Sequence, residues 1–242
     1  MACMVSEVNF LVDLLQNTMA SKTKLVYFKG RGKGELIRLT LAAAGVEFDD
    51  VFLTEPEQLE KLREDGDLLF MQVPLLEIDG LKLVQSGAII RYLAHKHNMM
   101  GKTPEEQAMV DMLFEGSRDF INLGFGSVVF KATEEEKQQT LDLIKSKAKG
   151  RYLPIFEKVY KKSTSGFLVG DSLTLADIAW LEVLLWLHEI EPQFAISFPG
   201  VAAFTNKISS LPNVSAFLYG PQRQPQPDEI YVTTVRKVLN WY

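Results

Sequence analysis

The sequence predicts a small α/β domain followed by an all-helical domain, and three observations support this fold class. Segments with strand and helix patterns alternate from residue 24 onward. After Asn98 the strand patterns stop, and the remaining apolar repeats have helical spacing. A chain of 242 residues is long enough for two such domains. We therefore expect one domain at 21–98 and a helical domain at 99–242, after a weakly ordered N-terminal leader at 1–20.

The first domain is expected to have the order β-α-β-α-β-β-α. "KLVYF" has the composition of a strand, and "ELIRLTLAAAG" has apolar residues at helical spacing with Gly45 as its C-terminal stop. Acidic residues begin the second helix and Gly66 ends it, whereas Ser86 is the expected N-cap of the third. Asp79-Gly80 is a typical hairpin turn. The expected strands are 24–28 and 46–53, with a hairpin over 74–84, and the expected helices are 35–45, 55–66 and 86–98.

The second domain is expected to consist of helices separated by Gly, Pro and Ser. One of these helices has an explicit start signal in "LTLADIAW". Thr174 is placed to be the N-cap, Asp177 three residues later can cap it reciprocally, and Leu173 can pack on Ile178. The expected helices are 104–123, 134–162, 174–191, 199–210 and 228–240.

Composition excludes several classes of function. The net charge of -5 argues against a nucleic-acid surface. Cys3 is the one cysteine, so a thiol redox pair, an intramolecular disulfide and a cysteine zinc site are ruled out, and a cytoplasmic location is expected. His95, His97 and His188 have no convincing metal-binding spacing with carboxylates, so no metal is expected.

The N-terminal segment does not have the pattern of a secretory signal. It lacks a basic start and carries Glu7 and Asp13. Met19 is a second candidate start, so residues 1–18 are expected to be dispensable. No run of 18 apolar residues is present, and no membrane span is expected.

Three positions in the first domain could carry chemistry. Tyr27 ends a strand just before a helix N-terminus, where its hydroxyl could stabilise an oxyanion or a thiolate, although by itself a packed aromatic is the commoner role. Val73 before Pro74 should be extended, and an X-Pro bond in a bend can be cis, so its backbone could pair with a peptide-like ligand. The alternative for Pro74 is an ordinary strand start. Ser86 and the helix N–H groups could bind a carboxylate.

The order and spacing of several motifs resemble the cytosolic glutathione transferases, most closely the alpha class. They are "YF.GRG..E.IR...AAAGVEF", "KLREDG.L.F.QVP..EIDG.KLVQS.AI.RY.A", "D...EG..D", "RY.P.FEKV" and "GFLVGDSLTLADI", and the likeness runs from about residue 22 to 240. The resemblance implies an α/β thioredoxin-like N-terminal domain plus an all-α C-terminal domain. It also implies a homodimer with glutathione as cosubstrate and hydrophobic electrophiles as partners.

The resemblance implies roles for particular residues. Tyr27 matches the catalytic tyrosine that donates a hydrogen bond to the glutathione sulfur, so the enzyme needs no nucleophilic cysteine of its own. The residues that match glutathione contacts are Arg63, Gln72, Val73, Pro74, Gln85 and Ser86. Among them the backbone of Val73 matches the partner of the cysteinyl part, and Pro74 matches the cis-proline that presents it. Gln85 and Ser86 match the γ-glutamyl carboxylate contacts, and Arg63 lies near the glycyl carboxylate.

Other matched positions concern the dimer and the electrophile. Asp119 and Arg151 match residues that reach the glutathione of the partner subunit, and Phe70 matches an aromatic wedge between subunits, with an ordinary core residue as its alternative. The terminal "VRKVLNWY" resembles the lid helix over the electrophile, with Leu239 and Trp241 in the positions of its aromatics.

Lys33 departs from the alpha-class pattern, which has an arginine at the head of the first helix. Lysine keeps the positive charge but lacks the planar guanidinium, so weaker activation of the thiol is expected.

The leading functional hypothesis is conjugation of glutathione to hydrophobic electrophiles, with glutathione peroxidase or isomerase side activities. The alternative is a non-catalytic carrier of apolar ligands or a crystallin-like structural protein on the same fold. The presence of Tyr27, Gln85 and Ser86 favours the enzyme. A thioredoxin-type oxidoreductase is excluded because the chain has no dithiol.

Overall fold

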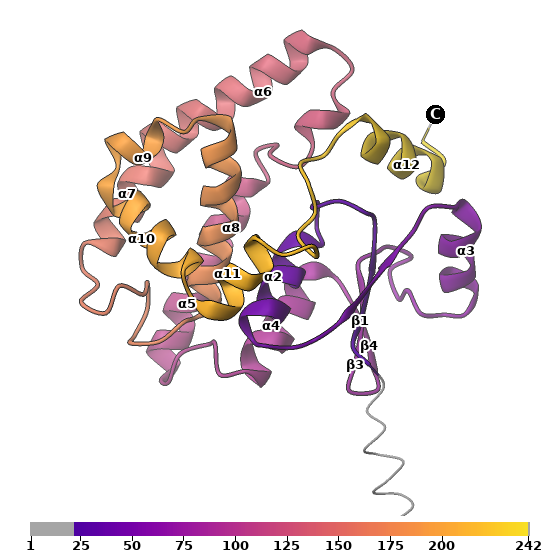
Figure 1. The fold of residues 1–242 in the computed structure, drawn as a ribbon, viewed down its shortest axis with the longest axis horizontal. Coiled ribbons are helices and arrows are strands. Elements are labelled where there is room, and N and C mark those ends of the chain that lie inside the picture. The colour runs from indigo at the N-terminus through magenta and orange to yellow at the C-terminus, as the bar shows by residue number, and fades with distance from the viewer. Residues whose placement is uncertain (1–21, 242) are drawn as a thin grey trace, which may run out of the picture.

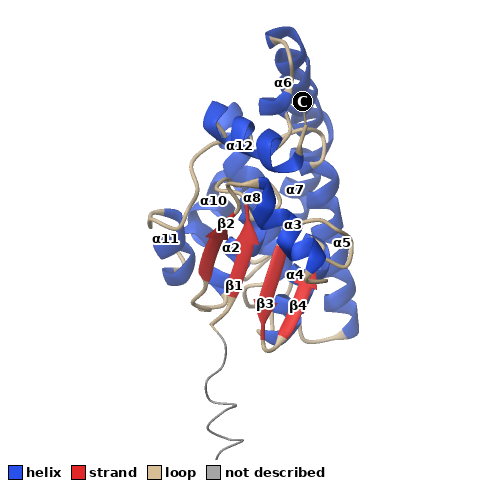
Figure 2. Ribbon diagram, turned by 90° about the vertical axis from the view of Figure 1, so that its right-hand side faces the viewer, coloured by secondary structure: helices blue, strands red, loops and turns tan. Residues whose placement is uncertain are grey.

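The computed structural model describes residues 22–241, and the leader predicted at 1–20 and Cys3 lie outside them. A four-stranded sheet with the order β2-β1-β3-β4 organises the first part of the chain (Figure 2). Its strands are β1 (Lys24–Tyr27), β2 (Asp49–Phe52), β3 (Leu75–Ile78) and β4 (Leu81–Val84). β1 is parallel to β2 and antiparallel to β3. The helical crossover permits the parallel pair, and the Asp79-Gly80 turn closes the β3–β4 hairpin.

Three helices belong to this sheet region, as the alternating pattern predicted. They are α2 (Glu35–Ala43), α3 (Pro56–Glu64) and α4 (Ser86–Lys96). α2 and α4 pack against each other and connect the sheet to the helical region, whereas α3 lies on the other side of the strands (Figure 1). Gly45 and Gly66 follow the ends of α2 and α3 with φ of 70° and 77°, so both predicted stop signals are confirmed.

The helical region is built around α8 (Leu175–Ile190), whose residues are buried along most of its length. α8 packs against α5, α2 and α10. The other helical elements are α5 (Pro104–Ile121), a 3₁₀ turn η1 (Val128–Phe130), α6 (Glu134–Lys147), a π turn η2 (Ala148–Tyr152), α7 (Leu153–Tyr160), α9 (Phe194–Ser197), α10 (Pro199–Ser209), α11 (Pro212–Leu218) and α12 (Glu229–Leu239). α12 crosses back to contact α3 of the sheet region (Figure 1). Within residues 22–241, no helix combines the length and apolarity needed to cross a membrane.

The predicted reciprocal cap of Thr174 and Asp177 at the start of α8 is confirmed, whereas the packing of Leu173 on Ile178 stays a prediction. Asp177 Oδ2 accepts hydrogen bonds from the Thr174 N–H and hydroxyl, both at 2.8 Å. Its Oδ1 accepts a third from the Leu168 N–H at 2.7 Å. Asp177 is fully buried, so these bonds satisfy a carboxylate that has no access to water. The cap therefore also ties the preceding loop to the central helix.

The structure corrects several details of the prediction. Ser86 is the first residue of α4 and not its N-cap, because Gln85 occupies that position with a φ of 70° and provides no side-chain cap. The expected helix 134–162 is divided by η2 into α6 and α7. The short elements η1, α9 and α11 were not predicted, since segments of three to seven residues carry little periodic signal. The domain boundary near residue 98 stays a prediction.

Candidate functional site

A cavity of about 880 Å³ lies between the carboxyl end of β1, the helices α5 and α8, and α12. This size suits a small-molecule ligand. Tyr27, Lys33, Arg63, Gln72, Val73 and Ser86 line its sheet side, Phe114, Arg118, Asn122, Glu182 and Trp186 line its helical side, and Tyr231, Val235, Leu239 and Trp241 line it from α12 and the residues that follow. The topology thus brings together residues from both parts of the chain.

The Tyr27 side chain is buried in the wall of this cavity, with 7% of its surface exposed. Its hydroxyl accepts a hydrogen bond from the backbone N–H of Lys33 at 3.0 Å. Burial raises the pKa of Tyr27, while hydrogen bonds from the Lys33 backbone and the Tyr231 hydroxyl, together with the charge of Arg38, act to lower it. Tyr27 is therefore protonated at neutral pH, and its own proton is available for a ligand.

The glycines of "GRGKG" allow the loop to close around two phenol rings. A Cβ on Gly32 would lie 2.6 Å from the Tyr27 hydroxyl and 2.9 Å from the Tyr231 hydroxyl, and Gly32 has a φ of 40°. A Cβ on Gly34 would lie 2.8 Å from the Tyr27 ring, and one on Gly30 would lie 2.3 Å from the Tyr231 ring. The spacing of these three glycines is thus explained by contact with the site.

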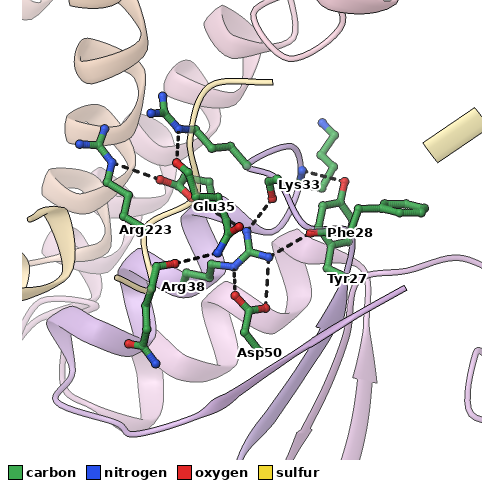
Figure 3. A network of polar contacts seen from close by, with 11 residues as sticks. Tyr27, Phe28, Lys33, Glu35, Arg38, Asp50 and Arg223 are labelled. Carbon is green, nitrogen blue, oxygen red and sulfur yellow. Dashed lines mark hydrogen bonds and ion pairs between the residues drawn. The ribbon is translucent and has the colours of Figure 1, made fainter. Parts of the chain in front are cut away.

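Arg38 holds the same loop from below (Figure 3). Its side chain is fully buried and donates to the Asp50 carboxylate at 2.6 and 3.1 Å. It also donates to the backbone oxygens of Gly30 at 2.7 Å and Phe28 at 3.2 Å. The buried guanidinium thus has both a counter-charge and backbone acceptors, and these bonds fix the turn after Tyr27.

Arg31 connects this loop to the rest of the chain. Its guanidinium donates to both oxygens of Glu189 on α8, at 2.9 and 2.7 Å, and lies over the Trp186 ring. Its Nε donates to the backbone oxygen of Gln224 at 3.0 Å, in the connector that leads to α12. One side chain therefore joins the loop after Tyr27, the central helix and the segment that carries α12.

The Lys33 ammonium extends to the helical side of the cavity. It donates to Asn122 Oδ1 on the residue that ends α5, at 2.9 Å. The contact with the Tyr27 hydroxyl comes from the backbone nitrogen of Lys33, as Figure 3 shows. The charge that acts on Tyr27 is that of Arg38.

The predicted peptide-pairing residue Val73 has the required backbone. The Val73–Pro74 bond is cis, and β3 begins only at Leu75. Among the described residues, none hydrogen-bonds to the N–H or C=O of Val73. Ser86, at the first turn of α4, also lines the cavity. An extended ligand could thus pair with Val73 while its anionic end meets a helix N-terminus.

Arg63 lies near the same part of the cavity. Its Nε donates to the Met71 backbone oxygen at 3.1 Å, and its Nη1 pairs with Glu60 at 2.6 Å.

Four predicted residues do not line the cavity of this chain. Pro74 and Gln85 are adjacent in sequence to lining residues, and Asp119 and Arg151 are exposed on the helical region. Phe70 is 57% exposed, so its alternative role as an ordinary core residue is wrong for the single chain.

The sequence reading missed Tyr231. It lies on the same face of α12 as Val235 and Leu239, four and eight residues later, and all three line the cavity. The spacing of four and eight residues could have identified these three residues in the sequence as one face of a helix. Arg118, Asn122 and Glu182 were also missed, because nothing local marks them as neighbours. Within residues 22–241, no group of three potential metal ligands is present.

Comparison with known proteins agrees with this arrangement. The family model described as "Glutathione S-transferase, N-terminal domain" matches residues 23–95, and the one described as "Glutathione S-transferase, C-terminal domain" matches residues 118–220. The chain is 48% identical over 224 residues to glutathione S-transferase A4 of Mus musculus and 47% identical to glutathione S-transferase alpha-4 of Rattus norvegicus. Each match covers 92% of this chain and 100% of the relative.

Solved structures give the same result. Na-GST-3 of Necator americanus, described as monomeric, has a TM-score of 0.73 and 33% identity, covering 86% of this chain and 99% of its own. The glutathione S-transferase of Ascaris lumbricoides has a TM-score of 0.72 and 33% identity, covering 85% of this chain and 98% of its own.

Proposed function

Because the chain belongs to the glutathione S-transferase family and is a transferase with glutathione as its cosubstrate, we propose that it conjugates hydrophobic electrophiles and that Tyr27 activates the sulfur. The single observation that carries this proposal is the Tyr27 hydroxyl. It is buried at the cavity wall, it accepts a hydrogen bond from Lys33 N–H, and its own proton can be donated to a ligand. The comparisons give no support to the carrier or crystallin-like alternative.

The energy required for activation is within reach of this site. A free thiol has a pKa of about 8.5, and lowering it by about two units takes about 2.7 kcal/mol of preferential thiolate stabilisation. One hydrogen bond to a charged group contributes about 1.5–3 kcal/mol. The Tyr27 hydroxyl can supply most of the required thiolate stabilisation, and the N-terminus of α2 adds a favourable electrostatic field. Since the Lys33 ammonium lies on Asn122, we assign Lys33 a weaker role in activation.

The remaining cavity residues fit the three parts of glutathione. We propose that the backbone of Val73, presented by Pro74, pairs with the cysteinyl part. Ser86 and Gln85 bind the γ-glutamyl carboxylate at the start of α4, and Arg63 and Gln72 lie at the glycyl end. Leu239 and Trp241 supply apolar surface for the electrophile.

We also propose a two-fold homodimer, located in the cytoplasm. Leu69, Phe70 and Met71 are consecutive and 78%, 57% and 51% exposed, an apolar patch that a second copy would cover. Asp119 and Arg151 are exposed outside this chain's own cavity, as residues that reach a partner's site would be. Since the Necator americanus neighbour is described as monomeric, the state must be measured.

Sedimentation tests the dimer. Phe70→Ser should shift the protein towards a monomer, because it removes apolar surface from the patch. Leu143→Ser, at an exposed position on α6, is the matched control and should leave the mass unchanged. An active monomer of the unchanged protein at assay concentration would contradict a shared site.

Tyr27→Phe tests the proposed activation. The variant should fold and bind glutathione but lose conjugation by about 30- to 100-fold, the equivalent of one thiolate-specific hydrogen bond of about 2–3 kcal/mol. Thiolate absorbance of bound glutathione at neutral pH should fall in parallel. Tyr219→Phe, at a side chain that is 83% exposed, is the matched control. Unchanged thiolate and turnover in Tyr27→Phe would contradict the assignment.

A further inference from the structure

The helical side of the cavity carries a charged pair that the proposed activation does not use. Arg118 on α5 forms an ion pair with Glu182 on α8, in which Nη2 lies 2.7 Å from Oε2. It also donates to the Ala179 backbone oxygen at 3.3 Å and to Ser117 Oγ at 3.2 Å, and it lies over the Phe114 ring. Glu182 is 2% exposed, and among the described residues its ion-pair partner in this poorly solvated place is Arg118.

Lys33 adds a second positive charge beside this pair. Its ammonium is held by Asn122, a neutral amide, and within residues 22–241 no carboxylate forms an ion pair with it. Burial lowers the pKa of Lys33, and the charge of Arg118 lowers it further, while Glu182 opposes this shift. Lys33, Arg118 and Glu182 all line the cavity, so this group of two cations and one carboxylate has an excess positive charge.

Both cations have donors to spare. The Arg118 hydrogen bonds use Nε and Nη2, and among the described residues none accepts from Nη1. The ammonium of Lys33 has two protons beyond the one given to Asn122. Both donor groups lie on the helical side of the cavity, although Lys33 reaches it from the loop before α2 and Arg118 belongs to α5. An anionic group placed between them would gain two charge-assisted hydrogen bonds and relieve the repulsion between the cations.

We propose that Lys33 and Arg118 bind a carboxylate on the electrophile, so that the enzyme prefers hydrophobic electrophiles with an acidic tail over neutral ones. This inference rests on the proposed conjugating function. Of the residues assigned to glutathione, Val73 precedes β3 and Ser86 begins α4, whereas Arg118 lies on α5 and Asn122 directly follows it. The carboxylate subsite is therefore assigned to the electrophile.

The reaction with such a substrate leaves the carboxylate unchanged. In the addition to an α,β-unsaturated aldehyde, the glutathione sulfur forms a bond to the β-carbon and the electron pair of the double bond moves towards the carbonyl. The α-carbon then takes up a proton, and no group leaves. The carboxylate serves to position the apolar chain.

A matched pair of substrates tests the subsite. One is a medium-chain α,β-unsaturated aldehyde with a terminal carboxylate, and the other is its methyl ester, whose reactive end is the same. The acid should have the higher kcat/KM, by about fivefold at low salt, the effect of one partly exposed ion pair. The preference should shrink in 0.5 M NaCl because salt screens the interaction. Rates without enzyme correct for intrinsic reactivity.

Two variants should move the acid-to-ester ratio in opposite directions. Asn122→Glu gives Lys33 a carboxylate partner at an exposed position and should abolish the preference. Glu182→Gln removes the negative charge but keeps an acceptor for Arg118, and should increase the preference about threefold. A change in activation of the sulfur alters kcat/KM for the acid and the ester by the same factor. The acid-to-ester ratio of kcat/KM therefore reports binding of the carboxylate alone. Asn206→Glu, the same substitution at an exposed position of α10, should leave the ratio unchanged.

The outcomes separate the two proposals. An ester conjugated as well as the acid, with one ratio in all variants, would overturn the subsite and leave the conjugating function intact. Failure of both substrates to react above background would overturn the conjugation of such electrophiles and the subsite with it. A ratio that falls in Asn122→Glu and rises in Glu182→Gln supports the subsite.

Discussion

The starts of α2 and α8 differ in how their free backbone N–H groups are satisfied. At α8, Thr174 and Asp177 cap each other, and the cap is buried. At α2 the N-cap is Gly34, without any side-chain cap, and the preceding N–H of Lys33 donates to the Tyr27 hydroxyl. The first start is closed by its own side chains, whereas the second is bonded through backbone atoms, with Gly34 and Glu35 N–H on Arg31 O, and has no side-chain cap where it meets the cavity. An uncapped helix start can therefore mark a functional site where a capped one marks the scaffold.

Among variants that test the difference between the two helix starts, Asp177→Ala should have the largest effect, which is on the stability of the fold. The change leaves two buried N–H groups, of Leu168 and Thr174, without an acceptor. We expect a loss of about 4 kcal/mol in the free energy of unfolding, measured by urea denaturation, with little change in kcat per folded molecule. Asp171→Ala is the matched control, because that carboxylate is exposed and pairs with Lys102 at the surface, and it should cost less than about 1 kcal/mol. Equal losses of unfolding free energy in the two variants would contradict a large contribution of the α8 cap to stability.

Gly32→Ala should have the next largest effect, this time on activity. Its Cβ would meet the Tyr27 and Tyr231 hydroxyls, and alanine is strained at a φ of 40°. The Tyr27 hydroxyl must move, and a displacement of about 1 Å can reduce a rate about 100-fold. Steady-state kinetics should show the fall in kcat/KM. Gly116→Ala, on α5 where a Cβ meets nothing within 4 Å, should be neutral or slightly stabilising. Full activity of Gly32→Ala would mean that the loop is looser than its contacts indicate.

Tyr231→Phe should have the smallest effect. The Tyr231 hydroxyl lowers the pKa of Tyr27 by hydrogen bonding, so its removal should raise that pKa and make Tyr27 a weaker donor. The pKa of Tyr27 should rise because the hydrogen bond from Tyr231 stabilises the phenolate form of Tyr27 more than the neutral form. We expect about fivefold slower conjugation, the equivalent of one neutral hydrogen bond. Ultraviolet titration of Tyr231→Phe, compared with the same protein lacking the Tyr27 hydroxyl, measures the shift. A lower pKa for Tyr27 would reverse the assigned direction.

Interactions between residues close together in the sequence could be predicted, and those between distant residues could not. The reciprocal cap of Thr174 and Asp177 lies within four residues and was predicted, whereas the bond from Leu168, nine residues before Asp177, was not. The periodic patterns placed the strands and most helices, and Tyr27 was located at the end of β1. The contact between Lys33 and Asn122 joins residues 89 positions apart, and no local pattern carries that information. The position of the Lys33 ammonium, expected near the sulfur, could therefore be described only once the fold was known.

The anchoring of α12 has a consequence for how the substrate range can change. Arg31 donates a hydrogen bond to the backbone oxygen of Gln224 in the connector, and every amino acid has this atom. The identity of residue 224 is thus irrelevant to that bond, whereas beyond it Tyr231 is constrained by its contacts with Gly30, Gly32 and Tyr27. A terminal helix from another protein of this fold could therefore be grafted after residue 224 to alter selectivity, provided that it keeps a tyrosine at position 231 to fill the space above Gly30 and Gly32.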